Sequence, residues 1–262
     1  MSNALRTATK SALGATVATA LPQCGYDRCI FILAHMRCGS TALSNILCTR
    51  PDVSGYGEAH VRYDGKGALG RLVVNQALRK SWKPGATHLF DKILHNRHDE
   101  AAPEAFFRSF GIFVARRPAA SIRSICKLYR DLGRDGEYPD HEAAAIYYLE
   151  RLHAMHLLWD RFAPERRFGI THAALLADPE AALAALGTQL ALSPPLENRY
   201  ESHAASRKGG GGDPFASGKY TRIEARADAP EADAALELDI SPDLRAKVEA
   251  AYARFEAQVA GA

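Results

Sequence analysis

The sequence lacks a large excess of either charge, a long apolar run and a Pro/Ser-rich linker. Lys and Arg number 33 against 30 Asp and Glu, and this net charge of +3 gives no reason to expect a nucleic-acid partner. No stretch of 18 apolar residues occurs, so no segment is expected to span a bilayer. Hydrophobic residues still make up 47% of the 262 positions, enough to bury a substantial core. These features predict one globular domain in which any anion site is local.

Cysteine is also scarce. The five cysteines are an odd number scattered over the first half of the chain, which argues against a disulfide framework and indicates reduced thiols in a cytoplasmic protein. Cys24 and Cys29 lack a second Cys/His pair at zinc-site spacing. The sequence therefore predicts no metal site.

The N-terminal segment over 1–26 is rich in Ala, Thr and Ser and carries Arg6 and Lys10 but no acid. Ala18-Thr19-Ala20 has the small-x-small form of a signal-peptidase site, but the apolar stretch before it is short and interrupted by Ser, Thr and Gly. We favour a flexible or weakly helical tail over 1–26, followed by the folded domain over 27–262.

Short apolar runs of strand length alternate with segments of helical periodicity along the rest of the chain. The predicted strands cover 29–34, 87–94, 111–115 and 168–170. The predicted helices cover 41–47, a segment from 119 onward, 141–162, 181–190 and 242–259. Strands that alternate with helices predict an α/β fold with a doubly wound parallel sheet flanked by helices.

The loop after the first predicted strand can bind an anion, because a helix begins at Thr41 and its N-terminal N–H groups converge there. Compared with a Walker A motif, Ala34 stands at the first Gly, Gly39 keeps the second, and Ser40 replaces the Lys. Arg37 can supply the missing cation, since its planar guanidinium suits tetrahedral oxyanions. The alternative is an ordinary tight turn.

A second Arg and hydroxyl follow another predicted strand. Arg116 comes at its carboxyl end, the edge where open α/β sheets bind ligands, and Ser124 lies two turns along the next helix. Two strand ends that each present an Arg and a hydroxyl would suit a ligand with two separated anionic groups. A solvated Arg pair, Arg116 with Arg117, is the alternative interpretation.

These residues resemble the motifs of sulfotransferases that use 3′-phosphoadenosine 5′-phosphosulfate (PAPS). The segment 37–43 is similar to the R-S-G-S-T-x-L loop, 116–118 with the hydroxyl at 124 is similar to R-D-P…S, and 207–213 is similar to R-K-G-x-x-G-D. The resemblance continues from about residue 31 to the C-terminus, and His172 stands near the family's adenine-contacting Tyr. It implies a single-domain P-loop-like fold, with the 5′-phosphosulfate held by Arg37, Cys38, Gly39, Ser40, Thr41 and Ala42. The 3′-phosphate would be held by Arg116, Ser124, Arg207, Lys208 and Gly209.

The catalytic residues come from the same resemblance. Residues 51–60 are similar to the H-P-D-V…G-E segment of tyrosylprotein and bacterial carbohydrate sulfotransferases, which makes Glu58 the expected base. Residues 89–92 resemble the strand whose Lys, here Lys92, meets the transferred sulfuryl group. Cytosolic members place a catalytic His where this chain has Leu94, so His95 and His98 are displaced alternatives.

The resemblance implies sulfuryl transfer from PAPS to a hydroxyl of a carbohydrate or small-molecule acceptor, with PAP as product and no metal. Acceptor contacts are expected from 60–86 and 127–140. One alternative is a P-loop kinase-like phosphotransferase, against which the missing Walker Lys speaks. Another is a PAP- or nucleotide-binding module without turnover, against which Glu58 and Lys92 speak.

Overall fold

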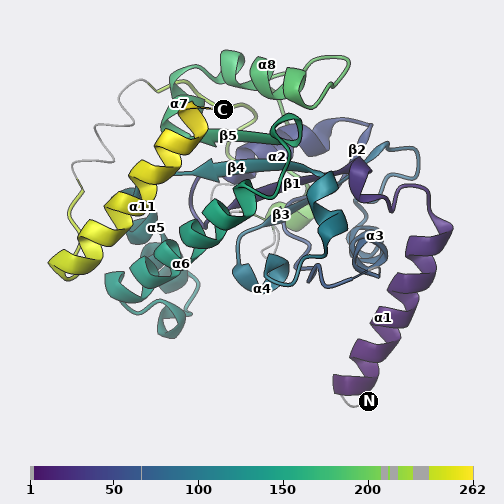
Figure 1. Cartoon of the computed structure of the whole chain (residues 1–262), viewed down its shortest axis with the longest axis horizontal. Coiled ribbons are helices and arrows are strands. Elements are labelled where there is room, and N and C mark those ends of the chain that lie inside the picture. Colours follow the sequence, from purple (N-terminus) through teal and green to yellow (C-terminus); the bar gives the residue numbers. More distant parts are fainter. Residues whose placement is uncertain (1–2, 66, 208–211, 213–217, 227–235, 262) are drawn as a thin grey trace.

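A five-stranded sheet in the order β2-β3-β1-β4-β5 carries the fold, and every neighbouring pair is parallel (Figure 1). The computed structural model describes residues 3–65, 67–207, 212, 218–226 and 236–261. The strands are β1 (Cys29–Ala34), β2 (Val53–Ser54), β3 (His88–Ile93), β4 (Phe110–Ala115) and β5 (Arg167–Thr171). Four of them confirm the predicted strands; β2 is additional.

Helices fill the connections between the strands and follow the last one. The α-helices are α1 (Asn3–Ala20), α2 (Ser40–Thr49), α3 (Ala68–Leu78), α4 (Asn96–Asp99), α5 (Pro118–Asp131), α6 (His141–Trp159), α7 (His172–Ala177), α8 (Pro179–Gln189), α9 (Ala204–Arg207) and α11 (Pro242–Ala260). Short 3-10 turns are η1 (Tyr26–Arg28), η2 (Glu104–Arg108), η3 (Asp135–Glu137) and η4 (Pro164–Arg166). The predicted single-domain α/β architecture is confirmed.

Helices cover both faces of the sheet. In Figure 1, α6 crosses in front of the strands and α2 lies fainter behind them, and α11 packs beside α6 and β5. All six residues of β1 are buried, as expected for the central strand of a covered parallel sheet. Phe31 of β1 stacks on Phe106, with ring centroids 4.6 Å apart, and joins an aromatic core with Phe113 and Phe162.

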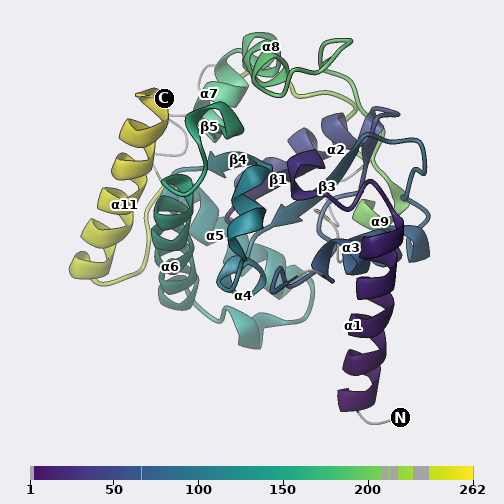
Figure 2. The same cartoon turned by 45° about the vertical axis from the view of Figure 1, so that its right-hand side comes forward.

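The N-terminal segment forms the helix α1, which projects from the rest of the chain and lies against α3 (Figure 2). A Cβ added at Gly70 of α3 would stand 1.8 Å from the carbonyl oxygen of Gly14, so the two backbones touch and only glycine fits. The boundary between a tail over 1–26 and a domain over 27–262 stays a prediction.

A buried ion pair fixes the ends of the two strands that lead to the site. Arg151 on α6 donates to the carbonyl oxygens of Ala34 and Ile93, both at 3.0 Å. It also contacts the Asp99 carboxylate at 2.8 and 3.0 Å, and both side chains are 1% exposed. The guanidinium therefore satisfies the last carbonyls of β1 and β3, where the candidate loops begin.

Within the described ranges, no helix has the length and apolar character needed to cross a bilayer. All five cysteines are free thiols, and those at 29, 38 and 126 are buried.

Candidate functional site

A cavity of about 940 Å³ opens at the carboxyl ends of β1, β3 and β4. Its lining falls into two groups by chain segment. The first follows β1 and β4 and the segments after β5: Met36, Arg37, Gly39, Ser40, Thr41, Ala42, Asn45, Arg116, His172, Leu175, Leu176, Tyr200, Gly212, Tyr220, Arg222, Ile223, Glu224 and Arg226. The second comes from the loop after β2, from β3 and the residues after it, and from α5 and the residues after it: Glu58, His60, Lys92, Leu94, His95, Arg97, Leu128, Tyr129, Leu132, Arg134, Glu137 and Tyr138.

The loop after β1 turns sharply into α2. Gly39 takes φ 85° at the N-cap, and Arg37 takes φ 66°, both in the left-handed region. A Cβ at Gly39 would stand 2.5 Å from Cδ2 of His172, so the imidazole lies directly against the loop. The positive end of α2 faces the cavity through Ser40, Thr41 and Ala42, which can hold an anionic ligand there. Cys38 is fully buried and does not line the cavity.

His35, which the motifs did not single out, joins this loop to the end of β4. Its Nδ1 donates to the Met36 carbonyl at 2.8 Å and its Nε2 accepts from the Arg116 amide at 3.0 Å, a pattern that requires the neutral imidazole. Burial lowers the pKa of His35 to about 3. Tyr148 donates to the Arg116 carbonyl at 2.8 Å. Side chains thus fix both backbone groups of Arg116.

This burial predicts a pH-dependent contribution to stability. Because the unfolded His35 has a pKa near 6.5, the unfolded chain binds the proton more tightly, so the contribution is full above pH 6.5 and is lost toward pH 3. The unfolding free energy lost in His35→Gln should be smaller at pH 5 than at pH 7.5 by about 2 kcal/mol. Urea denaturation at both pH values measures it, and an equal loss at both would contradict a buried neutral imidazole.

The two strand-end Arg and hydroxyl pairs predicted from sequence lie close together. Arg37 Nε donates to Ser124 Oγ at 2.9 Å, which links the loop after β1 to α5. Arg116 lines the main cavity and also a second cavity of about 460 Å³ that contains Ser124 and the α5 side chains of Arg123, Lys127 and Arg130. One extended anion could therefore contact both strand ends.

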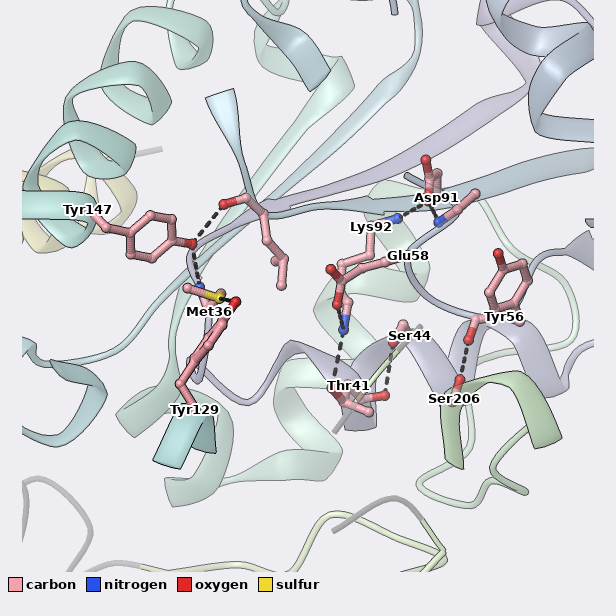
Figure 3. Close-up of polar contacts among 12 residues, drawn as sticks. Met36, Thr41, Ser44, Tyr56, Glu58, Asp91, Lys92, Tyr129, Tyr147 and Ser206 are labelled. Atoms are coloured by element: carbon pink, nitrogen blue, oxygen red, sulfur yellow. Dashed lines mark hydrogen bonds and ion pairs between the residues drawn. The ribbon is translucent and has the colours of Figure 1, made fainter. Parts of the chain in front are cut away.

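Lys92, Glu58 and Thr41, which all line the cavity, lie against one another (Figure 3). Lys92 Nζ donates to Thr41 Oγ1 at 3.2 Å and lies 3.4 Å from Glu58 Oε1. The Lys92 side chain is 1% exposed and that of Glu58 is 15% exposed. The ammonium thus stands between a helix N-terminus that can bind an anion and a carboxylate that solvent or a ligand can reach.

No protein-family model matches the chain, and neither does any curated protein. The sulfotransferase domain from the curacin biosynthetic pathway superposes with a TM-score of 0.57 at 15% identity, covering 87% of this chain and 97% of that domain. The sulfotransferase domain from the Synechococcus PCC 7002 olefin synthase gives 0.57 at 17% identity, covering 87% and 94%. The chain has the sulfotransferase fold. At these identities the likeness establishes the fold alone.

Within this sulfotransferase fold, the two histidine alternatives for the base lie apart from the Lys92 and Glu58 pair. His95 lines the cavity beside Tyr147, with ring centroids 5.3 Å apart, and burial lowers its pKa to about 3. His98 does not line the cavity, and burial lowers its pKa to about 4. Among the described residues, no hydrogen bond or ion pair joins either imidazole to Lys92 or Glu58.

The half of the cavity beyond Glu58 has an aromatic and aliphatic wall. Tyr129 and Tyr138 pack edge to face at 4.6 Å, and Leu94 and Leu128 line the same half. The expected acceptor segment 127–140 supplies several lining residues, whereas 60–86 contributes His60 among its described residues.

Gly212, the described residue of the glycine-rich segment, lies at the start of α2. Arg207 ends α9, whereas Lys208 and Gly209 lie outside the described residues. A Cβ at Gly212 would stand 3.2 Å from Thr41 Cγ2, so Gly212 lies beside the first turn of α2. No group of three or more His, Cys, Asp or Glu within the described part of the chain is arranged to hold a metal ion.

Proposed function

We propose that the protein is a PAPS-dependent sulfotransferase that moves a sulfuryl group from PAPS to a hydroxyl of a carbohydrate or small-molecule acceptor. The observation that carries the proposal is the position of Lys92 Nζ between Thr41 Oγ1 at the start of α2 and the Glu58 carboxylate. The sulfotransferase fold of the chain supports it. The five free thiols favour a cytoplasmic setting, where they stay reduced.

The donor contacts follow from the two strand ends. Arg37 and the N–H groups from Gly39 to Ala42 would hold the 5′-phosphosulfate against the positive end of α2. Arg116 and Ser124 would hold the 3′-phosphate. By resemblance, Arg207, Lys208 and Gly209 would close on that phosphate as well.

The chemistry needs fixed positive charge and one proton acceptor. The acceptor oxygen forms a bond to sulfur as the bond from sulfur to the PAP phosphate oxygen breaks, and negative charge spreads over the sulfuryl and bridging oxygens. Lys92 would stabilise that charge, because a buried ammonium acts without rearrangement of solvent. Glu58 would take the proton of the attacking hydroxyl.

The donor assignment is tested by binding. PAP should bind more tightly than 5′-AMP, and Arg116→Ala should reduce this preference roughly 10- to 100-fold, the effect of losing a charged hydrogen-bond partner. Calorimetric titration of both nucleotides measures the ratio. The matched control is Arg117→Ala, since the neighbouring guanidinium lies over the Tyr252 ring at 5.5 Å and should leave the ratio unchanged.

Equal affinity of the wild-type protein for PAP and 5′-AMP would overturn the assignment of the 3′-phosphate site. Sulfate transfer from labelled PAPS across a panel of hydroxyl compounds tests turnover itself. Transfer of phosphate from ATP in the same assay would instead favour the kinase-like alternative, and PAP binding without any product would favour a binding module.

A further inference from the structure

The loop that carries Glu58 has an unfavourable backbone. Gly57 takes φ 128° and His60 takes φ 53°, so a non-glycine residue sits in the left-handed region two positions after the expected base. The loop between β2 and α3 contains no helix or strand at these positions. Contacts from outside the loop must therefore hold this conformation.

Those contacts come chiefly from Asp91, the residue before Lys92 on β3. Its Oδ1 accepts from the Ala59 amide at 2.7 Å and from the Lys92 amide at 2.8 Å (Figure 3). The same Lys92 amide points at the carbonyl of Gly57, at 3.1 Å. The carboxylate thus ties the backbone on one side of Glu58 to the backbone of its ion-pair partner.

Two further side chains, Tyr63 and Asn75, complete this set of hydrogen bonds around Asp91 and Ala59, which we call the clamp. Tyr63 donates its hydroxyl to Asp91 Oδ2 at 2.7 Å and is itself fully buried. Asn75 on α3 donates to the Ala59 carbonyl at 3.0 Å. Side chains therefore fix both the N–H and the carbonyl of Ala59, the residue directly after Glu58.

We propose that Asp91, supported by Tyr63 and Asn75, is a positioning residue that holds the Glu58 carboxylate beside Lys92. Its catalytic consequence rests on the proposed function, but the holding of the loop does not. Asp91 is 1% exposed, on a strand in which all residues from Leu89 to Ile93 are buried. Burial raises the pKa of this carboxyl to about 7. A buried carboxyl lowers the stability of the fold unless hydrogen bonds compensate for its lost hydration, and the bonds from Ala59, Lys92 and Tyr63 do so here.

The first test compares two variants of Asp91. Asp91→Ala removes the acceptor, whereas Asp91→Asn keeps Oδ1 for both amides and can turn its amide toward the Tyr63 oxygen. We expect Asp91→Ala to lower kcat about 10- to 100-fold with PAP affinity within about twofold of wild type, and Asp91→Asn to keep kcat within about threefold. A parallel loss of PAP affinity, or equal damage from both variants, would overturn the proposal.

A double-mutant cycle separates positioning from general stability. If Asp91 acts through Glu58, its loss should have no further effect once Glu58 is replaced, so Glu58→Gln with Asp91→Ala should match Glu58→Gln alone within about twofold in kcat. If the kcat of the double variant instead falls by the product of the two single losses, Asp91 does not act through Glu58.

Amide hydrogen exchange decides the same question without any turnover. The amide of Ala59 should exchange at least about tenfold faster in Asp91→Ala than in Asp91→Asn, while amides of β4 stay unchanged. Equal exchange would overturn the proposal. If the wild-type protein transfers no sulfuryl group, the proposed function fails and this measurement still decides whether Asp91 holds the loop.

If Asp91→Ala does not fold, Asn75→Ala replaces it, because Asn75 is a partly buried position on α3. This variant should lower kcat at least about threefold, with PAP affinity unchanged and faster exchange of the amides from 57 to 61. Unchanged kcat together with unchanged exchange would contradict the clamp.

Discussion

Glu58→Gln should lower the rate of sulfuryl transfer by about 100-fold or more while PAP binds as it does to the wild-type protein. The amide keeps the size and polarity of the side chain but cannot accept a proton at neutral pH. Within the described residues, Glu58 pairs with Lys92 and forms no hydrogen bond or ion pair with the loop after β1, which would hold the donor. Steady-state kinetics with labelled PAPS and calorimetry with PAP measure the two quantities separately.

His95→Asn is the matched control for this assignment. The imidazole lines the same cavity, but among the described residues no hydrogen bond or ion pair joins it to Lys92. We expect its replacement to lower kcat by much less than that of Glu58. The opposite ranking would move the role of base to the histidine.

Much of the fold could be predicted because its central strands appear in the sequence as continuous apolar runs. The apolar runs at 29–34 and 111–115 correspond to buried parallel strands, and such strands need no alternation of polar and apolar residues. Strand β2 has two residues, Val53 and Ser54, too few for any periodicity to reveal. Its place beside β3 depends on pairing with residues more than 30 positions away.

Composition alone could not predict the helix at the N-terminus. The segment mixes alanine, the best helix former, with Thr, Ser and Gly14, whose helical propensities are low. Its packing becomes intelligible only when Gly14 is seen against Gly70, where the missing side chains let two helices touch. That contact joins residues 56 positions apart and leaves no local pattern in either segment.

The candidate site was likewise predicted only in part from the sequence. The resemblance to sulfotransferases implied one site with Arg37, Glu58 and Lys92, and the structure brings the latter two together. Asp91, Asn75 and His35 hold the surrounding loops through hydrogen bonds to backbone groups. Such bonds leave no pattern in the sequence, so these three residues were not predicted. An acid next to Lys92 within a strand, and His35 directly after an apolar strand, were the available hints.

Lys92→Met should lower kcat by about 100- to 1,000-fold, the usual effect of removing one fixed group that stabilises developing charge. Methionine fills a similar volume, and the ammonium it replaces is 1% exposed, so solvent cannot substitute for the lost charge. PAP affinity should fall far less than kcat, because the charge on the sulfuryl and bridging oxygens grows in the transition state. Single-turnover rates with saturating PAPS measure the effect.

The loss of kcat in Glu58→Gln and the loss of kcat in Lys92→Met should depend differently on the acidity of the acceptor hydroxyl. A hydroxyl with a low pKa needs less help in losing its proton, so the deficit of Glu58→Gln should shrink along a series of increasingly acidic acceptors. The deficit of Lys92→Met should stay nearly constant if, as proposed, Lys92 acts on the sulfuryl and leaving oxygens rather than on the proton. Equal shrinkage in both variants would mean that Lys92 acts mainly by orienting Glu58 across their 3.4 Å contact.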